Sequence, residues 1–381
     1  MVVQRVPFLD AVTDCTGGNA KVQRKDYLRI GDLPVIDQGQ DFIAGYTELN
    51  NKYSGTLPVV LFGDHTRIFK YIDFPFALGA DGVKVLQPSD GFDPQYLFYY
   101  FRSIKLPNAG YSRHFKFLKE IDVPKPSLIE QRCIIDLLSR AEGILRLRQE
   151  AEQKAAELIP SLFLHMFGDP ATNPKGWPVM TVDEVGEVKL GRQRAPKYQT
   201  GKFTRPYVRV ANVFENLIDV SDLLSMDFDK QDFLTYRLKH GDILLNEGQS
   251  IELVGRPAMW RDEVSDCCFQ NTLIRFRCSP ALVVPEFALA SFLWMYHAGQ
   301  FSQIASKTSN VAHLGAGRFT KLPIILPPLP LQVAFAKQAQ RIEAIARTLD
   351  TATAKAEATF QSLLALTFTG NLAKCKLRGL A

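Results

Sequence analysis

The sequence lacks the residue patterns of several common protein classes. Its six cysteines form no Cys-x-x-Cys pair, which excludes the ligand spacing of a zinc module and the framework of a disulfide-rich scaffold. The amino terminus has no apolar core after a basic start, and Pro285 and Glu286 interrupt the most apolar window, residues 281–298. We therefore expect no signal peptide, no membrane-spanning helix and a cytoplasmic location.

The motifs of common catalytic sites are also missing. No phosphate-binding loop, dinucleotide fingerprint, nucleophile elbow or His-Glu-x-x-His helix is present. Residues 93–96 (Asp-Pro-Gln-Tyr) resemble the base-gripping loop of amino-methyltransferases, but no glycine-rich cofactor loop follows a strand upstream. A proline at that place is typical of a helix start. We predict no catalytic residue and no metal site; an enzyme would instead bind S-adenosylmethionine as the isolated chain.

The strongest feature that is present is an internal repeat at an offset of 201 residues. Thirteen identities fall in about forty ungapped positions, among them Gln131 with Gln332 and Glu142 with Glu343. Each copy begins with prolines, which suit the start of a helix. The sequence is therefore a tandem duplication in which each half ends with the same helical segment.

Apolar residues recur every 3.5 positions along both copies, which predicts that the two helices pair with each other. Two separate amphipathic core helices are the alternative. From residue 134 to 162 a paired seam would run ~43 Å and would hold two globular domains apart. The predicted seam consists of Ile134, Leu137, Ala141, Ile144, Ala151, Ala155, Leu158 and Leu162 in the first copy and Phe335, Ile342, Ile345, Leu349, Ala352, Ala356 and Leu363 in the second.

The segments between the helices share a plan of short β-rich runs, glycine breaks and one aromatic helix started by a proline. We predict an α+β protein with two mixed α/β domains, residues 1–126 and 169–326. The two helical segments are predicted at residues 127–168 and 327–381, the second with a basic tail.

Basic clusters are a better functional signal than the net charge of +5, because residues 369–381 alone carry three basic residues and no acid. One acid-free run lies between Asp93 and Glu120, and another lies between Glu187 and Glu215. Both contain aromatic residues. Such runs neutralise DNA phosphates, and Arg or Gln side chains among them can read base edges. A solvated loop face is the alternative, but one run in each domain favours nucleic acid.

Two polar loops follow hydrophobic strands, residues 63–67 (GDHTR) and 246–250 (NEGQS). Side chains in such loops project from a rigid edge, as base reading requires. A tight turn is the simpler alternative.

The sequence resembles the specificity subunits of type I restriction-modification systems over essentially its whole length. The resemblance rests on the duplicated proline-led helices, on residues 161–169 (SLFLHMFGD) and 362–372 (SLLALTFTGNL), and on residues 37–46 (DQGQDFIAGY) with the two polar loops. It implies two target-recognition domains that each bind half of a split asymmetric DNA site, and two helices that pair as an antiparallel coiled-coil spacer.

The same resemblance implies a non-catalytic subunit. Its partners would be double-stranded DNA, two methyltransferase subunits and a translocating nuclease subunit; S-adenosylmethionine, ATP and magnesium would bind only to the partner subunits. The competing interpretation is a stand-alone DNA-binding or coiled-coil scaffold protein. The candidate DNA-contacting residues are Gln38, Gln40, Tyr46, His65, Thr66, Arg67, Arg102, Arg113, His114, Lys116, Arg192, Gln193, Arg194, Lys197, Tyr198, Lys202, Arg205, Asn246, Gln249 and Ser250.

Overall fold

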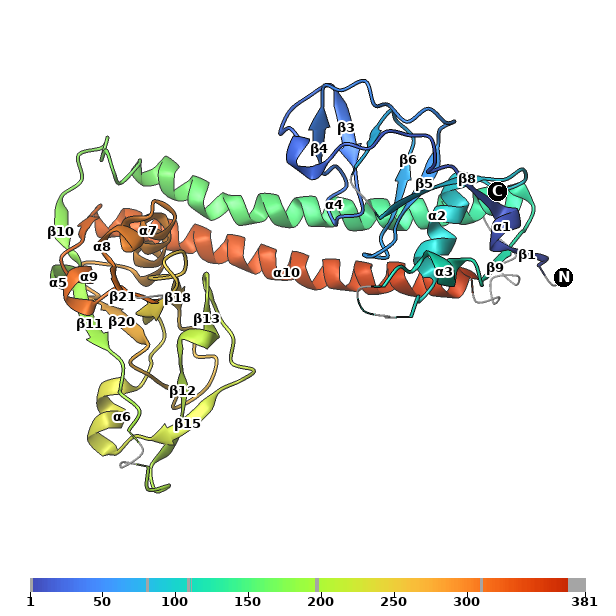
Figure 1. The fold of residues 1–381 in the computed structure, drawn as a ribbon. Coiled ribbons are helices and arrows are strands. Elements are labelled where there is room, and N and C mark those ends of the chain that lie inside the picture. The colour runs from blue at the N-terminus through green and yellow to red at the C-terminus, as the bar shows by residue number, and fades with distance from the viewer. Residues whose placement is uncertain are drawn as a thin grey trace, which may run out of the picture. The chain divides into compact units, whose positions relative to one another are not determined.

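The chain folds into two compact units that both combine helices with small sheets. The computed structural model describes residues 3–79, 82–107, 110, 112–195, 199–308 and 311–368. Residues 1–150 with 351–381 form the first unit, and residues 151–350 form the second. The fold class is therefore α+β, as predicted (Figure 1). The predicted basic tail, residues 369–381, lies outside the described residues.

The first unit is built around two sheets. Its strands are β1 (Arg5–Pro7), β2 (Val12–Asp14), β3 (Leu33–Ile36), β4 (Gly45–Thr47), β5 (Val59–Gly63), β6 (Phe69–Ile72), β7 (Ala77–Leu78), β8 (Val83–Pro88) and β9 (Asp122–Pro124). Its short helices are α1 (Phe8–Ala11), η1 (Arg24–Asp26), α2 (Pro94–Ser103) and α3 (Phe115–Leu118). The strand orders are β2-β8-β5-β6 and β4-β3-β7, while β1 pairs with β9.

The second unit has the same two sheets and additional hairpins. Its strands are β10 (Val179–Thr181), β11 (Gly186–Leu190), β12 (Thr204–Val208), β13 (Val213–Phe214), β14 (Leu217–Ile218), β15 (Leu224–Asp227), β16 (Ile243–Asn246), β17 (Gly248–Gln249), β18 (Pro257–Met259), β19 (Cys268–Phe269), β20 (Leu273–Cys278), β21 (Ser306–Thr308), β22 (Val311–His313) and β23 (Pro323–Ile325). Its short helices are α5 (Val182–Val185), η3 (Val210–Asn212), α6 (Lys230–Tyr236), α7 (Pro285–His297), α8 (Gln300–Ile304) and α9 (Ala316–Phe319).

The strand order is the same in both units. The four-stranded sheet of the second unit runs β11-β20-β16-β18, and its three-stranded sheet runs β15-β12-β19. The parallel pair β3–β7 in the first unit has its equivalent in the parallel pair β12–β19 in the second. Likewise, β1–β9 corresponds to β10–β23. The sheet β17-β22-β21 and the hairpin β13-β14 are found in the second unit among the described residues.

The aromatic helices α2 and α7 begin as the sequence predicts. Pro94 is the first residue of α2, and the side chain of Asp93 accepts a hydrogen bond from the Gln95 amide at 2.9 Å. Pro285 begins α7 in the same way. The interpretation of residues 93–96 as a helix start is thus confirmed, because Asp93 caps the free amides of the first turn.

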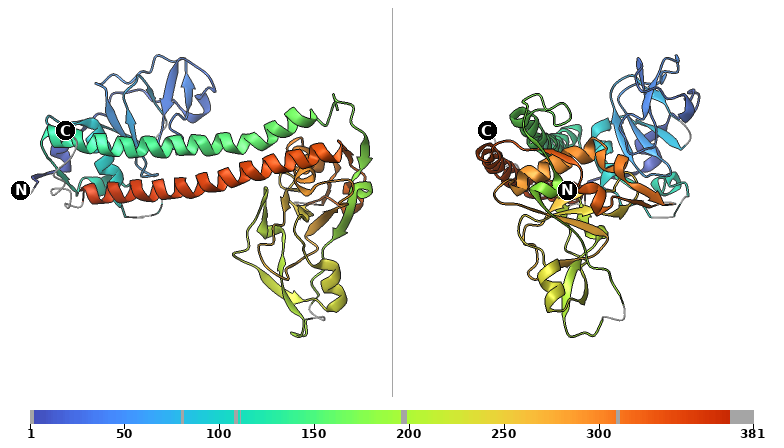
Figure 2. Two further views of the ribbon diagram at one scale, coloured as in Figure 1. Left: turned by 180° about the vertical axis from the view of Figure 1, so that it is seen from behind. Right: turned by 90° about the vertical axis from the view of Figure 1, so that its left-hand side faces the viewer.

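Two long helices, α4 (Leu128–Phe167) and α10 (Leu329–Phe368), contribute to both units. In the first unit, Leu138 and Leu145 of α4 share one core with Phe360 and Leu364 of α10. The two helices lie side by side in this unit (Figure 2). In the second unit, Phe163 of α4 packs against Phe335 of α10, with ring centroids 5.9 Å apart. The start of each helix therefore meets the end of the other, and the two run in opposite directions.

The buried face of α4 differs from the predicted seam by one residue in the first unit. Leu138 and Leu145 are 0% and 8% exposed, whereas Leu137 and Ile144 are 40% and 53% exposed. Adjacent apolar residues make both faces compatible with the same period, and packing against the aromatic side of α2 selects one of them.

The predicted seam residues fall into three groups by burial. Ala155 and Phe335 are buried, and a half-buried group lies at the edges of the contact. The prediction was wrong for the exposed residues Leu137, Ile144, Leu158 and Ile345. The half-buried group consists of Ile134, Ala141, Ala151, Leu162, Ile342, Leu349, Ala352, Ala356 and Leu363.

We predict that Leu138→Ala lowers the free energy of unfolding by about 2–5 kcal/mol, because it leaves a cavity in the shared core of α2, α4 and α10. The neighbouring Leu137→Ala is the matched control and should cost less than about 1 kcal/mol, since that side chain is partly solvated. Urea titration of both variants measures the difference. Equal losses would mean that the two leucines are equally buried.

Candidate nucleic-acid interface

Three loops of the first unit meet around Asp64, the residue that follows β5. The Asp64 carbonyl oxygen accepts a hydrogen bond from the His114 amide at 2.9 Å. Its carboxylate oxygen Oδ1 accepts another from the Phe115 amide at 2.7 Å. Asp64 is 4% exposed. This buried carboxylate therefore joins the loop after β5 to the segment that leads into α3.

The loop after β3 packs on the same site through Gln38. The side-chain oxygen of Gln38 accepts a hydrogen bond from the His65 amide at 3.2 Å. The Thr66 hydroxyl donates to the Gln38 carbonyl oxygen at 2.6 Å. Gly82 has a φ of +91°, and a Cβ there would lie 2.6 Å from the Gln38 amide nitrogen. The close approach of the Gln38 side chain therefore requires glycine at this position.

A buried lysine anchors the far side of that loop. Lys70 of β6 donates to the carbonyl oxygens of Asp37 at 2.9 Å and Asp41 at 2.5 Å. Burial lowers the pKa of the Lys70 ammonium, while Asp37 and Asp41 act in the opposite direction. Lys70 is thus a structural cation, and the basic contacts available to a ligand must come from the loop tips.

The tip of the loop after β5 presents Arg67 in a strained backbone conformation. Its φ is +63°, a region that a non-glycine residue occupies at a cost of about 1–3 kcal/mol. The Arg67 amide donates to the Gly63 carbonyl oxygen at 2.7 Å, which closes the turn. The side chains of Gln40, Thr66, Arg67, Arg113 and Lys116 are exposed on this loop cluster. Backbone strain at an exposed arginine is typical of a binding loop.

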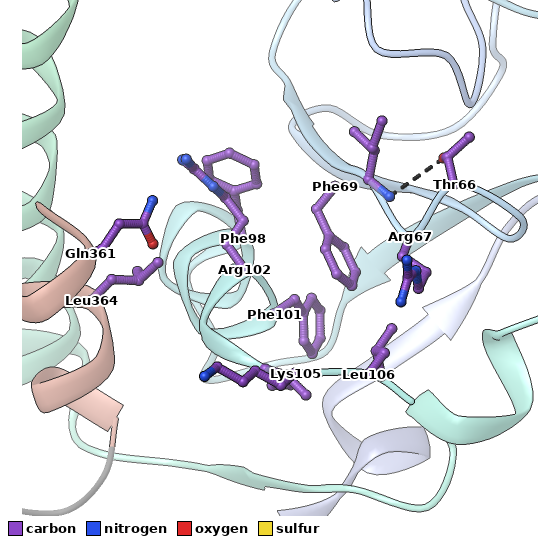
Figure 3. A pocket seen from close by; sticks show the side chains of 12 residues that line it. Thr66, Arg67, Phe69, Phe98, Phe101, Arg102, Lys105, Leu106, Gln361 and Leu364 are labelled. Carbon is purple, nitrogen blue, oxygen red and sulfur yellow. Dashed lines mark hydrogen bonds between the residues drawn. The ribbon is translucent and has the colours of Figure 1, made fainter. Parts of the chain in front are cut away.

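Arg102 and Tyr46 do not belong to this exposed group. Arg102 pairs with Glu142 of α4 at 2.5 Å and lies over the rings of Phe98 and Phe360. It lines a pocket of about 640 Å³ together with Arg67 and Phe69 (Figure 3). Tyr46 is half-buried on β4, where it pairs with Pro34 of β3 in the three-stranded sheet. The main role of Arg102 is therefore to hold α2 on the long helix.

The second unit gathers its loops around Glu247, the residue that follows β16. The Glu247 amide donates to the Thr272 carbonyl oxygen at 2.9 Å, and the Leu314 amide donates to the Glu247 carbonyl oxygen at 2.8 Å. His313 Nδ1 lies 3.0 Å from the Glu247 carboxylate. The Arg192 amide also donates to the Phe269 carbonyl oxygen at 3.1 Å. The basic segment at residue 192 and the loop 246–250 are therefore both attached to residues 269–272.

Acidic residues distant in the sequence neutralise part of the basic run. Arg192 pairs with Asp232 at 2.5 Å, and Arg209 pairs with Asp222 at 2.6 Å. Arg205 lies over the Phe233 ring. Gln193, Arg194 and Lys202 are exposed, whereas Lys197 and Tyr198 lie outside the described residues. The exposed charge of this segment is smaller than its sequence indicates.

Two candidate contact residues are buried. His114 is 1% exposed, and its Nδ1 lies 3.0 Å from the Asp64 carbonyl oxygen. Asn246 is 0% exposed, and neither amide atom has a hydrogen-bond partner in the described part of the chain. Both side chains are buried in their units, which does not favour the predicted DNA contacts of these two residues. Gln249 and Ser250 are half-buried and remain accessible.

Asp227 is an organising residue that the sequence did not reveal. Its carboxylate accepts hydrogen bonds from the amides of Thr200 and Gly201 at 2.5 and 2.7 Å and from the Thr204 hydroxyl at 3.0 Å. Burial raises the pKa of Asp227, but these hydrogen bonds outweigh burial and lower the pKa to about 2. Asp227 therefore fixes the loop that carries Lys202. The turn-forming Thr-Gly pair at residues 200–201 was the only available signal.

Within the described residues, no group of three or more His, Cys, Asp or Glu side chains is arranged to hold a metal ion. No helix of the described ranges is both long enough and apolar enough to cross a membrane. The exposed loop tips of the two units present hydrogen-bonding and cationic side chains, which suit a polar, negatively charged ligand.

Residues 174–358 match the family model of the type I restriction modification DNA specificity domain. The chain is 22% identical over 357 residues to the EcoR124I/EcoR124II specificity subunit of Escherichia coli, covering 87% of this chain and 83% of that protein. It is 26% identical over 165 residues to the putative type I restriction enzyme MjaX specificity subunit of Methanocaldococcus jannaschii. That match covers 43% of this chain and 39% of the archaeal protein.

Two solved structures have a similar fold over nearly the whole chain. The S subunit of a type I restriction-modification system from M. genitalium has a TM-score of 0.58 and 13% sequence identity, with 95% of each chain covered. A chain from a study of complex assembly and conformational transition of the type I R-M system has a TM-score of 0.55 and 16% identity, with 97% of this chain and 98% of that chain covered. At these identities the likeness establishes the fold.

We predict that acid releases the loop held by Asp227. Because the folded-state pKa of about 2 lies below the ordinary aspartate value of 3.8, the stabilisation is present above about pH 4 and is lost as the pH falls toward 2. Pepsin cleavage within residues 199–204 should therefore rise steeply over that interval. Asp227→Asn should be cut readily at about pH 4 already. Identical cleavage profiles for the two proteins would contradict this role.

Proposed function

We propose that this chain is a specificity subunit of a type I restriction-modification system, the class of proteins that it resembles, and that each of its two units binds one half of a split DNA site. The observation that carries the proposal is the pair of loop clusters, one around Asp64 and one around Glu247. Each presents exposed Arg and Gln side chains, the residue types that read guanine and adenine in the major groove.

The contacts within each cluster favour base reading by loop tips held on a rigid support. Gln40, Arg67 and Arg113 carry this role in the first unit, and Gln193 and Arg194 carry it in the second. Arg192 and Arg102 act as supporting residues, because internal carboxylates already neutralise them. Since the two clusters differ in sequence, the two half-sites differ and the full site is asymmetric.

We further propose that α4 and α10 form the antiparallel coiled-coil spacer of a duplicated protein. A seam of ~43 Å corresponds to about thirteen base pairs at ~3.4 Å per pair, slightly more than one turn of DNA. Both units could then bind the same face of one duplex. The unspecified base pairs of the site would lie between the two half-sites.

The resemblance to this family supports a proposal about partners. We propose that it catalyses nothing by itself and docks two methyltransferase subunits along its helices, with a translocating nuclease subunit joining them. S-adenosylmethionine, ATP and magnesium would act on those partners. Expression of the chain with its methyltransferase subunit, followed by genome-wide mapping of modified adenines, tests the proposal. A two-block motif with a fixed gap supports it; no new modification supports a scaffold role instead.

Removal of exposed cations should weaken DNA binding and its dependence on salt. For the Arg194→Ala/Lys202→Ala double variant we predict lower affinity for duplex DNA and a log–log salt slope smaller by about two, since each phosphate contact contributes ~0.9. The double variant Lys154→Ala/Lys355→Ala removes the same charge from exposed positions on the long helices. Fluorescence anisotropy between low and moderate salt measures the DNA affinity and the salt slope of both double variants. Equal losses in the two variants would argue against a localised interface.

Lengthening the spacer should lengthen the gap between the half-sites. Inserting one heptad into each long helix adds ~10 Å, which corresponds to about three base pairs. We predict that the two specified blocks stay the same while the gap grows by that amount. Methylome sequencing gives the result directly. An unchanged gap would mean that the helices hold the partners but do not measure the site.

A further inference from the structure

Each long helix has a buried glutamine in its first turn. The side-chain amide of this glutamine forms hydrogen bonds with loops of the same unit. Gln131 is 0% exposed, and its Oε1 accepts a hydrogen bond from the Asp93 amide at 2.8 Å. Its Nε2 donates to the carbonyl oxygens of Gly91 at 2.8 Å and Pro126 at 3.0 Å. The side chain thus connects the first turn of α4 to the capping residue of α2.

Gln332 repeats this arrangement at the start of α10. It is also 0% exposed, and its Oε1 accepts from the Val284 amide at 3.0 Å. Its Nε2 donates to the carbonyl oxygens of Leu282 at 3.0 Å and Pro327 at 2.8 Å. Val284 is the N-cap residue of α7 as Asp93 is of α2, but it makes no side-chain capping hydrogen bond. Two unlike loop sequences have therefore kept the same three hydrogen bonds.

A second attachment lies on each helix eleven residues farther along, about three turns or ~16 Å away on the same face. Glu142 of α4 accepts hydrogen bonds from the Tyr99 hydroxyl at 2.8 Å and from Arg102 at 2.5 Å. Glu343 of α10 accepts one from Arg261 at 2.7 Å. Both partners of Glu142 are on α2, and Arg261 follows β18. Each helix is therefore attached at two points to the unit in which it begins.

We propose that the Gln131/Glu142 and Gln332/Glu343 pairs are positioning residues that set the gap between the two DNA half-sites. The apolar packing of Leu138 and Leu145 is non-directional, whereas two hydrogen-bonded attachments on one face fix the direction of the helix. A tilt of only ~5° over a ~43 Å helix displaces the far end by ~4 Å, slightly more than the ~3.4 Å of one base pair. A fixed gap therefore needs a rigid joint at each unit. This inference rests on the proposed function.

The experiment compares Gln131→Met and Gln332→Met with the wild type, each expressed with its methyltransferase subunit. Methionine keeps the length and apolar stem of glutamine but cannot make the three hydrogen bonds. Gln153→Met on the exposed surface of α4 is the matched control. Methylome mapping then reports the two half-site sequences and the distribution of gap lengths separately.

We expect the wild type and Gln153→Met to modify one gap length, and each buried variant to modify sites whose gaps differ by about one base pair in either direction, with both half-sites unchanged. A loss of stability alone would lower modification at every site without widening the gap. A single, unchanged gap in both buried variants would overturn the inference. A wild type without a two-block site would overturn the proposed function instead.

A milder pair of variants covers the case in which a buried glutamine is indispensable for folding. Glu142→Gln and Glu343→Gln retain a hydrogen-bond acceptor but lose the ion pair, at positions that are only partly buried. Thermal melting identifies which variants fold. Folded variants of this pair should widen the gap distribution less than the methionine variants do. If they widen nothing while the methionine variants unfold, the positioning role is rejected.

Discussion

A buried amide must have its hydrogen-bonding atoms paired, and each long helix of this protein begins with one. Leaving a buried donor or acceptor without a partner costs about 1–3 kcal/mol, so the side chains of Gln131 and Gln332 hold six backbone groups of loops and caps in place. The aromatic helices α2 and α7 begin at these points. The position of each aromatic helix in turn decides which face of the long helix is covered.

The apolar pattern of the sequence predicted where the two long helices lie in the chain, but it did not predict which helix face is buried. Proline-led starts and a 3.5-residue period were enough to locate α4 and α10, because both signals are local. The covered face was not predictable, since Leu137 and Leu138, or Ile144 and Leu145, satisfy the period equally well. Only the aromatic side chains of α2, which come from another part of the chain, distinguish them. Packing against another part of the chain therefore decides which face of the long helix is buried.

The sequence likewise predicted the position of the candidate interface better than its contacts. Strand ends followed by polar loops indicated the segments that hold Asp64 and Glu247, because a loop after a buried strand stays near the edge of its sheet. The loops that gather around these two residues were not predicted. The charge on those clusters was not predictable from a local run, since Asp232 neutralises Arg192 from forty residues away. Burial of His114 and Asn246 was equally hidden, as both stand in polar stretches. Local sequence identified the loops, and distant sequence decides which side chains are available.

The composition of the first unit has a consequence for biosynthesis. Its core contains Phe360, Leu364 and Phe368 of α10, and Phe368 packs on Tyr96 and Tyr100 of α2 with ring centroids 5.6 and 5.3 Å apart. The three residues of α10 are synthesised after the whole of the second unit, residues 151–350. The first unit therefore cannot complete its core during its own translation and must keep an apolar helix surface uncovered until synthesis nears its end. The order of folding is thus the reverse of the order of synthesis, and the second unit, whose helix segments both emerge earlier, is the first able to close.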